Sequence, residues 1–289
     1  MLHSMTGYGK STFRLSDRNF FIEIKSLNSK TIDLNFKSTI DVRSNEIMIR
    51  KQLTNLLLRG KIDVFISEEK NNSTTTNLNF SLIENYYTQL QKFGKEKEIP
   101  LGDIIPSILR FQDVSKADID ELNETDFANI ENAINKAVEQ VITFRLEEGS
   151  QLENDIVQRI AAISTLKIEL EPFEIDRIEK VREKLQALFQ KYVQNNADKN
   201  RFEEELVYYL EKIDINEEKV RLDTHCKYFL EIIAENTLEK GKKLGFLAQE
   251  IGREINTIGS KANDAQMQKI VVQMKEELEK IKEQVLNIL

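Results

Sequence analysis

Two glutamates one helical turn apart, Glu250 and Glu254, lie in the stretch LAQEIGREINTIGSK. Together with Thr257 and Lys261 they recur at spacings of 4, 3 and 4, which places them on one polar face of a helix. Like charges at this spacing repel each other by about 0.2–0.5 kcal/mol on an open surface. Carboxylates placed in this way can reach one hard cation such as Mg²⁺ or Mn²⁺, so the stretch is a candidate metal site.

The same stretch has a purely structural interpretation. Glu250 and Glu254 can pair with Arg253, with Lys261 or with the basic surface of a neighbouring subunit, and residue spacing alone favours this alternative. If the site instead binds a phosphate group, Arg253 can hold it with two parallel hydrogen bonds. The sequence by itself leaves both interpretations open.

A histidine is the second candidate for chemistry. His225 lies in RLDTHCKYF and is one of two histidines in the chain. Arg221 precedes it by four residues, so the two side chains share one helix face. Spacing alone favours an exposed histidine on a charged helix. The functional alternative is a metal ligand or proton carrier, because imidazole is the side chain that titrates near pH 7.

Charge is distributed unevenly along the 289 residues. The net charge is −8, yet residues 1–61 carry eleven Lys and Arg against five Asp and Glu, and the excess of acids lies in residues 62–289. A basic N-terminal region predicts either a polyanionic partner or pairing with the acidic remainder of the same or a neighbouring chain. Two further basic clusters, RGK at 59–61 and GKK at 241–243, are not diagnostic alone.

Several classes of protein do not fit the sequence. The single cysteine, Cys226, cannot form an intramolecular disulfide or a Cys-based zinc site. The N-terminal stretch has no apolar signal region, and no apolar run approaches the roughly 20 residues of a membrane span. We therefore expect a cytoplasmic protein that does not bind a membrane. The common nucleotide-phosphate loops and the RNP-type aromatic motif of RNA-binding sheets are also missing from the sequence.

The N-terminal region predicts a sheet with a helix packed on it. Residues 20–25, 32–37 and 62–67 alternate apolar and polar side chains, which is typical of strands with one buried face. SLNSK, between the first two, predicts a hairpin loop, and GYGK at 7–10 is interpreted as a glycine-rich turn. Helical spacing from 43 to 60 predicts a helix that ends at Gly60. This region is therefore expected to be α+β, with a mostly antiparallel sheet.

Most of the remaining chain has helical periodicity. After a polar linker at 70–77, helical patterns at 126–171 and 172–195 predict a long helical hairpin arm with NNADKN, 195–200, as its turn. We expect an N-terminal α+β domain at 1–125, the arm at 126–200 and a C-terminal helical domain at 201–289. Gly252 and Gly259, inside a helix, predict a close approach by another backbone or by a substrate. The last helix, with Asp264 as its N-cap, carries an apolar seam for another helix.

Six sequence blocks resemble a known family. SMTGYG, EIKSLNSK, LLLRGKIDV, RLEEGSQL, EEELVYYLEKIDINEEKVRLDTHCKYF and the block beginning GKKLGFLAQEIGREINTIGSK occur in the order found in the YicC family of bacterial proteins. The resemblance covers almost the whole chain and is most specific from about residue 201 onward. It implies an endoribonuclease that cuts single-stranded RNA, depends on a divalent cation, Mn²⁺ or Mg²⁺, and assembles as a homo-oligomer, a hexamer that encloses the RNA.

The resemblance also implies roles for particular residues. The catalytic residues implied are His225, Glu250, Arg253 and Glu254, with Glu250, Glu254 and His225 as metal ligands. The RNA-binding residues implied are Lys25, Asn28, Lys30, Arg59, Lys61, Arg221, Arg253 and Lys261. This chain departs from the usual family pattern where Ser29 and Lys30 replace a His-Arg pair, and where Gly245 and Gly252 replace an Asp and an Asn.

These residues predict metal-assisted hydrolysis of an RNA phosphodiester. A cation held by Glu250 and Glu254 would polarise the phosphate and acidify a bound water, and Arg253 and Lys261 would stabilise the developing charge. A metal-independent variant has His225 activating the RNA 2′-hydroxyl. The alternative from a different functional class is a non-catalytic, oligomeric RNA-binding adaptor that delivers RNA to another nuclease.

Overall fold

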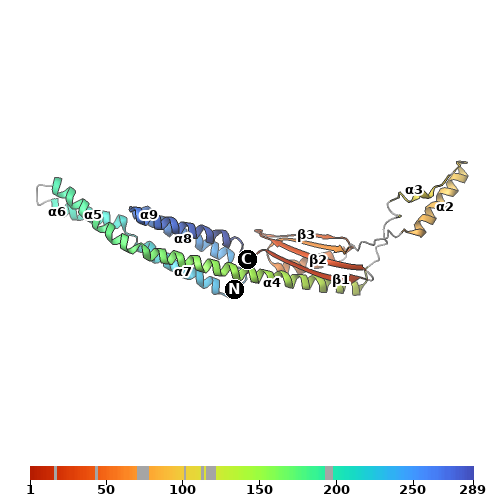
Figure 1. Cartoon of the computed structure of the whole chain (residues 1–289), viewed down its shortest axis with the longest axis horizontal. Helices are drawn as coiled ribbons and strands as arrows, with labels where there is room; N and C mark the ends of the chain where they lie inside the picture. The colour runs from red at the N-terminus through yellow and green to blue at the C-terminus, as the bar shows by residue number, and fades with distance from the viewer. Residues whose placement is uncertain are drawn as a thin grey trace.

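The computed structural model describes residues 1–15, 18–42, 45–69, 78–100, 102–111, 114, 122–192 and 198–289. The predicted linker at 70–77 and residues 195–197 of the predicted turn lie outside the described residues. The fold is α+β, as the sequence predicts. Figure 1 shows an elongated molecule in which one long helix runs beneath a sheet and continues into a bundle of helices.

The four-stranded sheet consists of β1 (Gly7–Leu15), β2 (Arg18–Leu27), β3 (Ile32–Ser38) and β4 (Gly60–Glu68). Its strand order is β1-β2-β4-β3. β1 pairs with β2 and β2 with β4 in antiparallel fashion, whereas β3 pairs with β4 in parallel. The prediction of a mostly antiparallel sheet is therefore confirmed, with β3 as a parallel edge strand.

Two local predictions in this region are wrong. SLNSK is not a hairpin loop, because β4 lies between β2 and β3 in the sheet. GYGK belongs to β1 and is not a turn. The strand was not recognised from the sequence because glycines, rather than apolar side chains, occupy two of its inward positions. The helix packed on the sheet lies too close to these positions for a side chain. A Cβ atom at Gly9 would lie 2.0 Å from the backbone oxygen of Ala137.

Two helices cover the inner face of the sheet. These are α1 (Glu46–Leu57) and the first half of α4 (Glu124–Glu169). The core between them is built from the inward residues of the strands, such as Phe20, Ile22 and Val64, packed against Ile134 and Val141 of α4. The predicted helix on one face of the sheet is confirmed as α1.

The helical arm follows from α4. After a bend at Leu170 the chain continues as α5 (Glu171–Tyr192), and it returns as α6 (Asp198–Ile213) and α7 (Asn216–Ala234). The bend does not reverse the chain, so the two halves of the hairpin are α4 with α5 and α6 with α7 (Figure 1). The second half of α4 contributes Ile156, Ile160 and Ile163 to a second core, shared with the C-terminal helices. One helix thus joins both cores, and the domain division given above remains a prediction.

The C-terminal helices α8 (Gly241–Ala262) and α9 (Ala265–Val285) pack against each other, α4 and α7. The apolar seam of α9 is buried within the chain, and Asp264 caps the helix by accepting hydrogen bonds from the N–H groups of Gln266 and Met267. The interior glycines of α8 serve this packing. Cβ atoms at Gly252 and Gly259 would meet the side chains of Leu278 and Val271 at 3.2 and 3.0 Å. The close approach predicted for Gly252 and Gly259 is therefore to a neighbouring helix.

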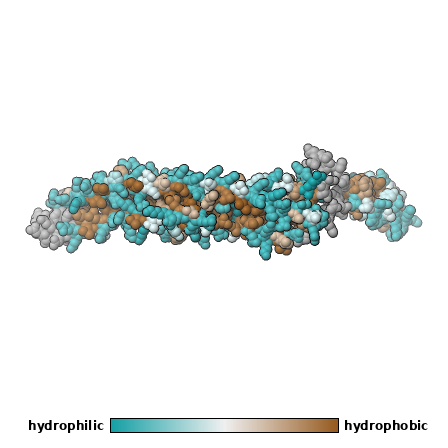
Figure 2. Space-filling model, turned by 90° about the horizontal axis from the view of Figure 1, so that it is seen from below, coloured by the Kyte–Doolittle hydropathy of each residue, from teal (hydrophilic) through white to brown (hydrophobic). Residues whose placement is uncertain are grey.

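A small pair of helices, α2 (Phe80–Glu96) and α3 (Ile105–Ile108), lies beyond the sheet at the far end of the molecule (Figure 1). Figure 2 shows apolar atoms gathered at this end. Phe80 is 75% exposed, and Phe93 and Phe111 are also exposed. None of the helices in the described ranges is long and apolar enough to span a membrane.

Candidate nucleic-acid groove and acidic helix face

The two ends of the chain meet where the sheet joins the helical bundle. Met5 N–H donates to the Asn287 carbonyl at 2.8 Å, and Leu289 N–H donates to the His3 carbonyl at 3.0 Å. Asn28, directly after β2, donates to the Leu286 carbonyl at 2.7 Å. These bonds attach the sheet, the N-terminal segment and the end of α9 to one another. The surfaces on either side of the junction therefore keep a fixed relation.

A buried arginine organises the same junction from within. Arg145 of α4 is 2% exposed, and it donates to the Leu57 carbonyl at 2.9 Å, to Ser26 Oγ at 2.6 Å and to the Arg59 carbonyl at 3.2 Å. Burial lowers the pKa of Arg145 to about 10, so the side chain remains charged at neutral pH. Its bonds hold the connection between α1 and β4, in which Leu58 has a φ of 57°.

Two adjoining cavities lie at this junction, with volumes of about 840 and 860 Å³. Both are lined by Lys30, Arg59, Lys242 and Phe246, so we describe them together as the junction groove. One wall comes from the sheet side, through the loops before β3 and before β4. The other wall combines the first turns of α8 with residues of α7 and α9, and it includes Glu239, Glu279 and Glu283.

The junction groove combines positive charge with exposed aromatic rings. Phe246 is 61% exposed, and Tyr228 of α7, which also lines the groove, is 47% exposed. Lys242 and Lys30 make no hydrogen bond or ion pair with any described residue, whereas Lys243 pairs with Glu235 at 3.3 Å. Unpaired cations beside exposed rings suit a single-stranded nucleic acid, whose phosphates and bases need both.

The predicted RNA-binding residues are divided between different surfaces. Lys30 and Arg59 line the junction groove, and Asn28 is at its edge with its amide bound to the Leu286 carbonyl. Lys25 and Lys61 instead lie on the outer face of the sheet, away from the side covered by helices. The sequence reasoning missed the contributions of Lys242 and Phe246. The GKK cluster was the available signal, but only the fold reveals its position opposite Arg59.

The acidic pair lies farther along α8. The side chain of Glu250 is 17% exposed, and its Oε1 atom lies 2.7 Å from Nη1 of Arg253. The direction of this contact does not make a hydrogen bond, and among the described residues Oε1 has no hydrogen-bond partner although it is buried. Glu254 is only 8% exposed and makes no hydrogen bond or ion pair with any described residue. The pair is therefore not neutralised by lysines, and Arg253 is its one basic contact within the described residues.

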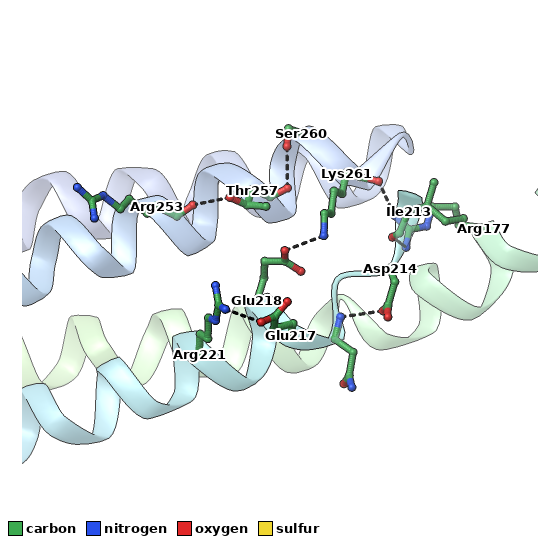
Figure 3. Close-up of polar contacts among 11 residues, drawn as sticks. Arg177, Ile213, Asp214, Glu217, Glu218, Arg221, Arg253, Thr257, Ser260 and Lys261 are labelled. Carbon is green, nitrogen blue, oxygen red and sulfur yellow. Dashed lines mark hydrogen bonds and ion pairs between the residues drawn. The ribbon is translucent and has the colours of Figure 1, made fainter. Parts of the chain in front are cut away.

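The remaining predicted residues pair elsewhere. Lys261 reaches from α8 to Glu218 of α7, with Nζ 2.7 Å from Oε1, and Arg221 pairs with Glu217 along α7 (Figure 3). Lys261 is thus engaged away from Glu250 and Glu254, which the spacing on the helix did not reveal.

His225 is half-buried on α7 and makes no hydrogen bond with a described residue. Among the described residues no three His, Cys, Asp or Glu side chains are grouped so that they could hold one metal ion. Glu250, Glu254 and His225 therefore do not form a three-ligand cluster in the single chain as its side chains lie here. Metal binding by these residues remains a prediction.

The carboxylate pair nevertheless fits a hard cation. Mg²⁺ is usually bound through one or two carboxylates, and water and substrate phosphates supply its other ligands. Oε1 of Glu250 is buried and accepts no hydrogen bond from a described residue, although the guanidinium group of Arg253 lies 2.7 Å away. A buried carboxylate oxygen without a donor is costly, and a cation would remove that cost.

Helix geometry connects the groove to the acidic pair. Phe246 lines the junction groove, and Glu250 follows it by one helical turn, about 6 Å along the same face of α8. Gln249, beside Glu250, also lines the groove. A strand seated on Phe246 would therefore pass close to the carboxylates.

Comparison with known proteins supplies the family. The family model described as "Endoribonuclease YicC-like, N-terminal region" matches residues 2–154, and "Endoribonuclease YicC-like, C-terminal" matches residues 170–289. The chain belongs to the YicC-like endoribonuclease family. A YicC-like relative in Clostridioides difficile, named "Probable endoribonuclease YicC", is 32% identical over 300 residues and covers 100% of both chains. A relative of the same name in Haemophilus influenzae is 29% identical over 297 residues, also covering 100% of both.

Proposed function

We propose that this protein is an endoribonuclease that binds single-stranded RNA in the junction groove and cuts it beside Glu250 and Glu254 with a divalent cation, Mn²⁺ or Mg²⁺. The observation that carries the proposal is the continuity of α8. This helix contributes Lys242 and Phe246 to the groove, and Glu250 and Glu254 follow Phe246 by one and two turns. The family membership supports RNA as the substrate.

Binding would use the groove's cations and rings. Lys30, Arg59 and Lys242 would neutralise backbone phosphates, and Phe246 and Tyr228 would stack on unpaired bases. A base inside a duplex does not present its flat face, so this arrangement selects single strands. The binding should weaken strongly as salt is added, because each neutralised phosphate releases counterions.

The chain's own groups would orient the scissile phosphate. A bound divalent cation would supply Lewis acidity and lower the pKa of its water. Glu250 and Glu254 would hold the cation. Arg253 lies beside Glu250 and its side chain is 72% exposed, so it can reach a phosphate. His225 remains the candidate proton carrier.

The test compares the wild type with Glu250→Gln/Glu254→Gln on a single-stranded RNA, with Mn²⁺ and with EDTA. We expect the double variant to lose about 100-fold or more in rate, the scale of losing a group that stabilises developing charge. The matched control is Glu179→Gln/Glu183→Gln, an exposed pair one turn apart on α5 that should cut normally. If Glu250→Gln/Glu254→Gln cuts RNA as fast as the wild type, the assignment of the cleavage site to these two glutamates is wrong.

The products distinguish the chemical routes. A 5′-phosphate on the downstream fragment indicates hydrolysis by an activated water, and a 5′-hydroxyl indicates attack by the RNA 2′-hydroxyl. A highly purified protein that binds RNA but never cuts it would support the adaptor alternative.

We further propose that the protein acts in the cytoplasm as a homo-oligomer, a hexamer.

A further inference from the structure

The outer face of the sheet is open. Helices α1 and α4 cover the other side, and no helix in the described parts of the chain packs over this one. The alternating burial along β1 and β4 places Tyr8, Lys10, Lys61 and Phe65 on the open face. Sheets with one solvated face ordinarily carry polar side chains there. Aromatic rings in this position therefore call for an explanation.

Three rings from three different strands lie on this face. They are Tyr8 of β1, Phe21 of β2 and Phe65 of β4. The register sets Phe65 opposite Glu23, which makes Phe21 and Phe65 diagonal neighbours on adjacent strands. Such neighbours lie about 7–8 Å apart. Phe21 and Phe65 are therefore neighbours, whereas Tyr8 is opposite Lys25 and lies farther along the same face.

Each ring has a lysine beside it. Lys10 Nζ lies 4.8 Å from the centre of the Phe21 ring, Lys25 Nζ 5.9 Å from that of Tyr8, and Lys37 Nζ 5.7 Å from that of Phe65. Lys61 adds a fourth ammonium group on the same face. Rings interleaved with flexible cations can offer stacking surfaces and phosphate contacts within one nucleotide's reach.

The acidic residues on this face are largely engaged. Glu23 bonds with Tyr8 and Lys25. Burial raises its pKa, but these two hydrogen bonds and the charges of Lys25 and Lys10 together outweigh burial, so the pKa is lowered. Asp63 accepts a hydrogen bond from Asn35 at 2.9 Å. Only Asp33 has no hydrogen bond or ion pair among the acids of the face that the structure describes. The lysines therefore leave the face suited to a polyanion.

We propose that the open face of the sheet is a second binding surface for single-stranded RNA, on which bases stack against Tyr8, Phe21 and Phe65 and phosphates contact the neighbouring lysines. The proposal rests on the proposed function for its ligand class. It explains a division noted above, in which Lys25 and Lys61 lie outside the junction groove.

The chain connects the two surfaces. Arg59 lines the junction groove, Gly60 begins β4, and Lys61 is the first residue of that strand on the open face. One RNA strand leaving the groove past Arg59 would thus meet Lys61 next. The open face would hold the RNA flanking the cleavage site and make affinity depend on RNA length.

The test measures the affinity for a fluorescent 20-nucleotide oligouridine in EDTA. EDTA removes the divalent cation, so the RNA is not cut by the proposed activity during the measurement. Phe21→Leu/Phe65→Leu keeps apolar volume but removes two flat rings. Because stacking contributes about fivefold or more per base, we expect Kd to rise at least about 20-fold. Phe144→Leu, an exposed ring on α4, is the matched control and should leave Kd unchanged.

The lysines give an independent readout. Lys25→Gln and Lys61→Gln should each reduce the slope of log affinity against log salt by about 0.7, the value for one phosphate contact in a single strand. Ultraviolet crosslinking should attach the RNA to peptides containing Tyr8, Phe21 or Phe65. A folded ring variant with the wild-type Kd and salt slope would overturn the proposal. A ring variant that changes in molecular mass but not in RNA affinity would also overturn it, because a change in mass identifies a protein interface.

The two proposals fail separately. If the wild type cuts RNA and the ring variant binds RNA as well as the wild type, the open face is excluded and the endoribonuclease assignment stands. If no cleavage occurs but the ring variant loses affinity, the open face binds RNA and the assigned activity is wrong.

Discussion

At the scale of single residues, two buried cations at the junction are held by oxygen atoms that carry no formal charge. Lys240 is 1% exposed and donates to the carbonyls of Ile233 at 2.6 Å and Met1 at 3.3 Å. Arg145 is likewise held by carbonyl and hydroxyl oxygens. Neutral oxygens thus hold both buried cations and leave their charge in place, and Nε of Arg145 has no hydrogen-bond partner among the described residues. The charges of Lys240 and Arg145 act on the side chain of His3.

His3 makes stability depend on pH. Burial, followed by the positive N-terminus, Arg145 and Lys240, lowers the pKa of His3 below its ordinary value of 6.5. The unfolded chain therefore binds the proton first, and stability falls as pH drops through 6.5 towards the lower folded pKa. We expect the urea midpoint of the wild type to fall over this range.

His3→Gln provides the comparison for this prediction. The variant should show a smaller fall over the same pH range, because its side chain does not titrate. Parallel curves for the two proteins would show that His3 does not contribute to the pH dependence.

At the scale of secondary-structure elements, the fold depends on close approaches to α4. Gly149 lies inside α4, and a Cβ atom there would lie 2.1 Å from the Leu2 carbonyl oxygen. The N-terminal segment can therefore lie against α4 only where the helix has no side chain. This segment also bonds to the end of α9, so the contact at Gly149 affects the whole junction.

Two glycine substitutions in helix interiors should act in opposite directions. Gly149→Ala should destabilise the protein by about 2 kcal/mol, because the clash is with backbone and outweighs the gain in helix propensity. Gly245→Ala in α8 should stabilise it by up to about 1 kcal/mol, because the new Cβ atom lies 3.7 Å from Val285 Cγ1, an ordinary contact. Urea unfolding measures both. A Gly149→Ala protein as stable as the wild type would contradict the packing described here.

At the scale of the whole molecule, several apolar residues of α2 and α3 are exposed among the residues that the structure describes. Phe80 is 75% exposed, Phe93 52% and Ile105 47%, on a helical pair that lies beyond the sheet (Figure 1). Apolar groups gathered in this way commonly mark an interface. We therefore connect this end of the chain with the proposed oligomer.

Mass measurement in solution tests that connection. We expect the wild type to have six times the 33.6 kDa mass of the chain, and Phe80→Glu/Phe93→Glu to have a lower mass, because buried charges disfavour the contact. Ile175→Glu, at a 65% exposed position on α5, is the control and should retain the wild-type mass. A monomeric wild type would exclude the hexamer, and an unchanged double variant would exclude α2 from the interface.

The sequence by itself determined the features that arise within one helix. Residue spacings of three and four predicted the polar and apolar faces of α8, the N-cap at Asp264 and the buried seam of α9. They could do so because the backbone hydrogen bonds of a helix join residues within the same helix. The family was also visible in the order of its motifs. These features gave the acidic pair and its position, but not its surroundings.

Only the tertiary structure decided which distant residues meet. β1 escaped detection because its inward glycines make room for α4, and Lys261 pairs with Glu218 of another helix. The junction groove joins Arg59 to Phe246, and the ring group takes one residue from each of three strands, which no linear motif records. The physical reason is that strand pairing and packing between helices join residues far apart in the chain, whereas periodicity reports only on neighbours.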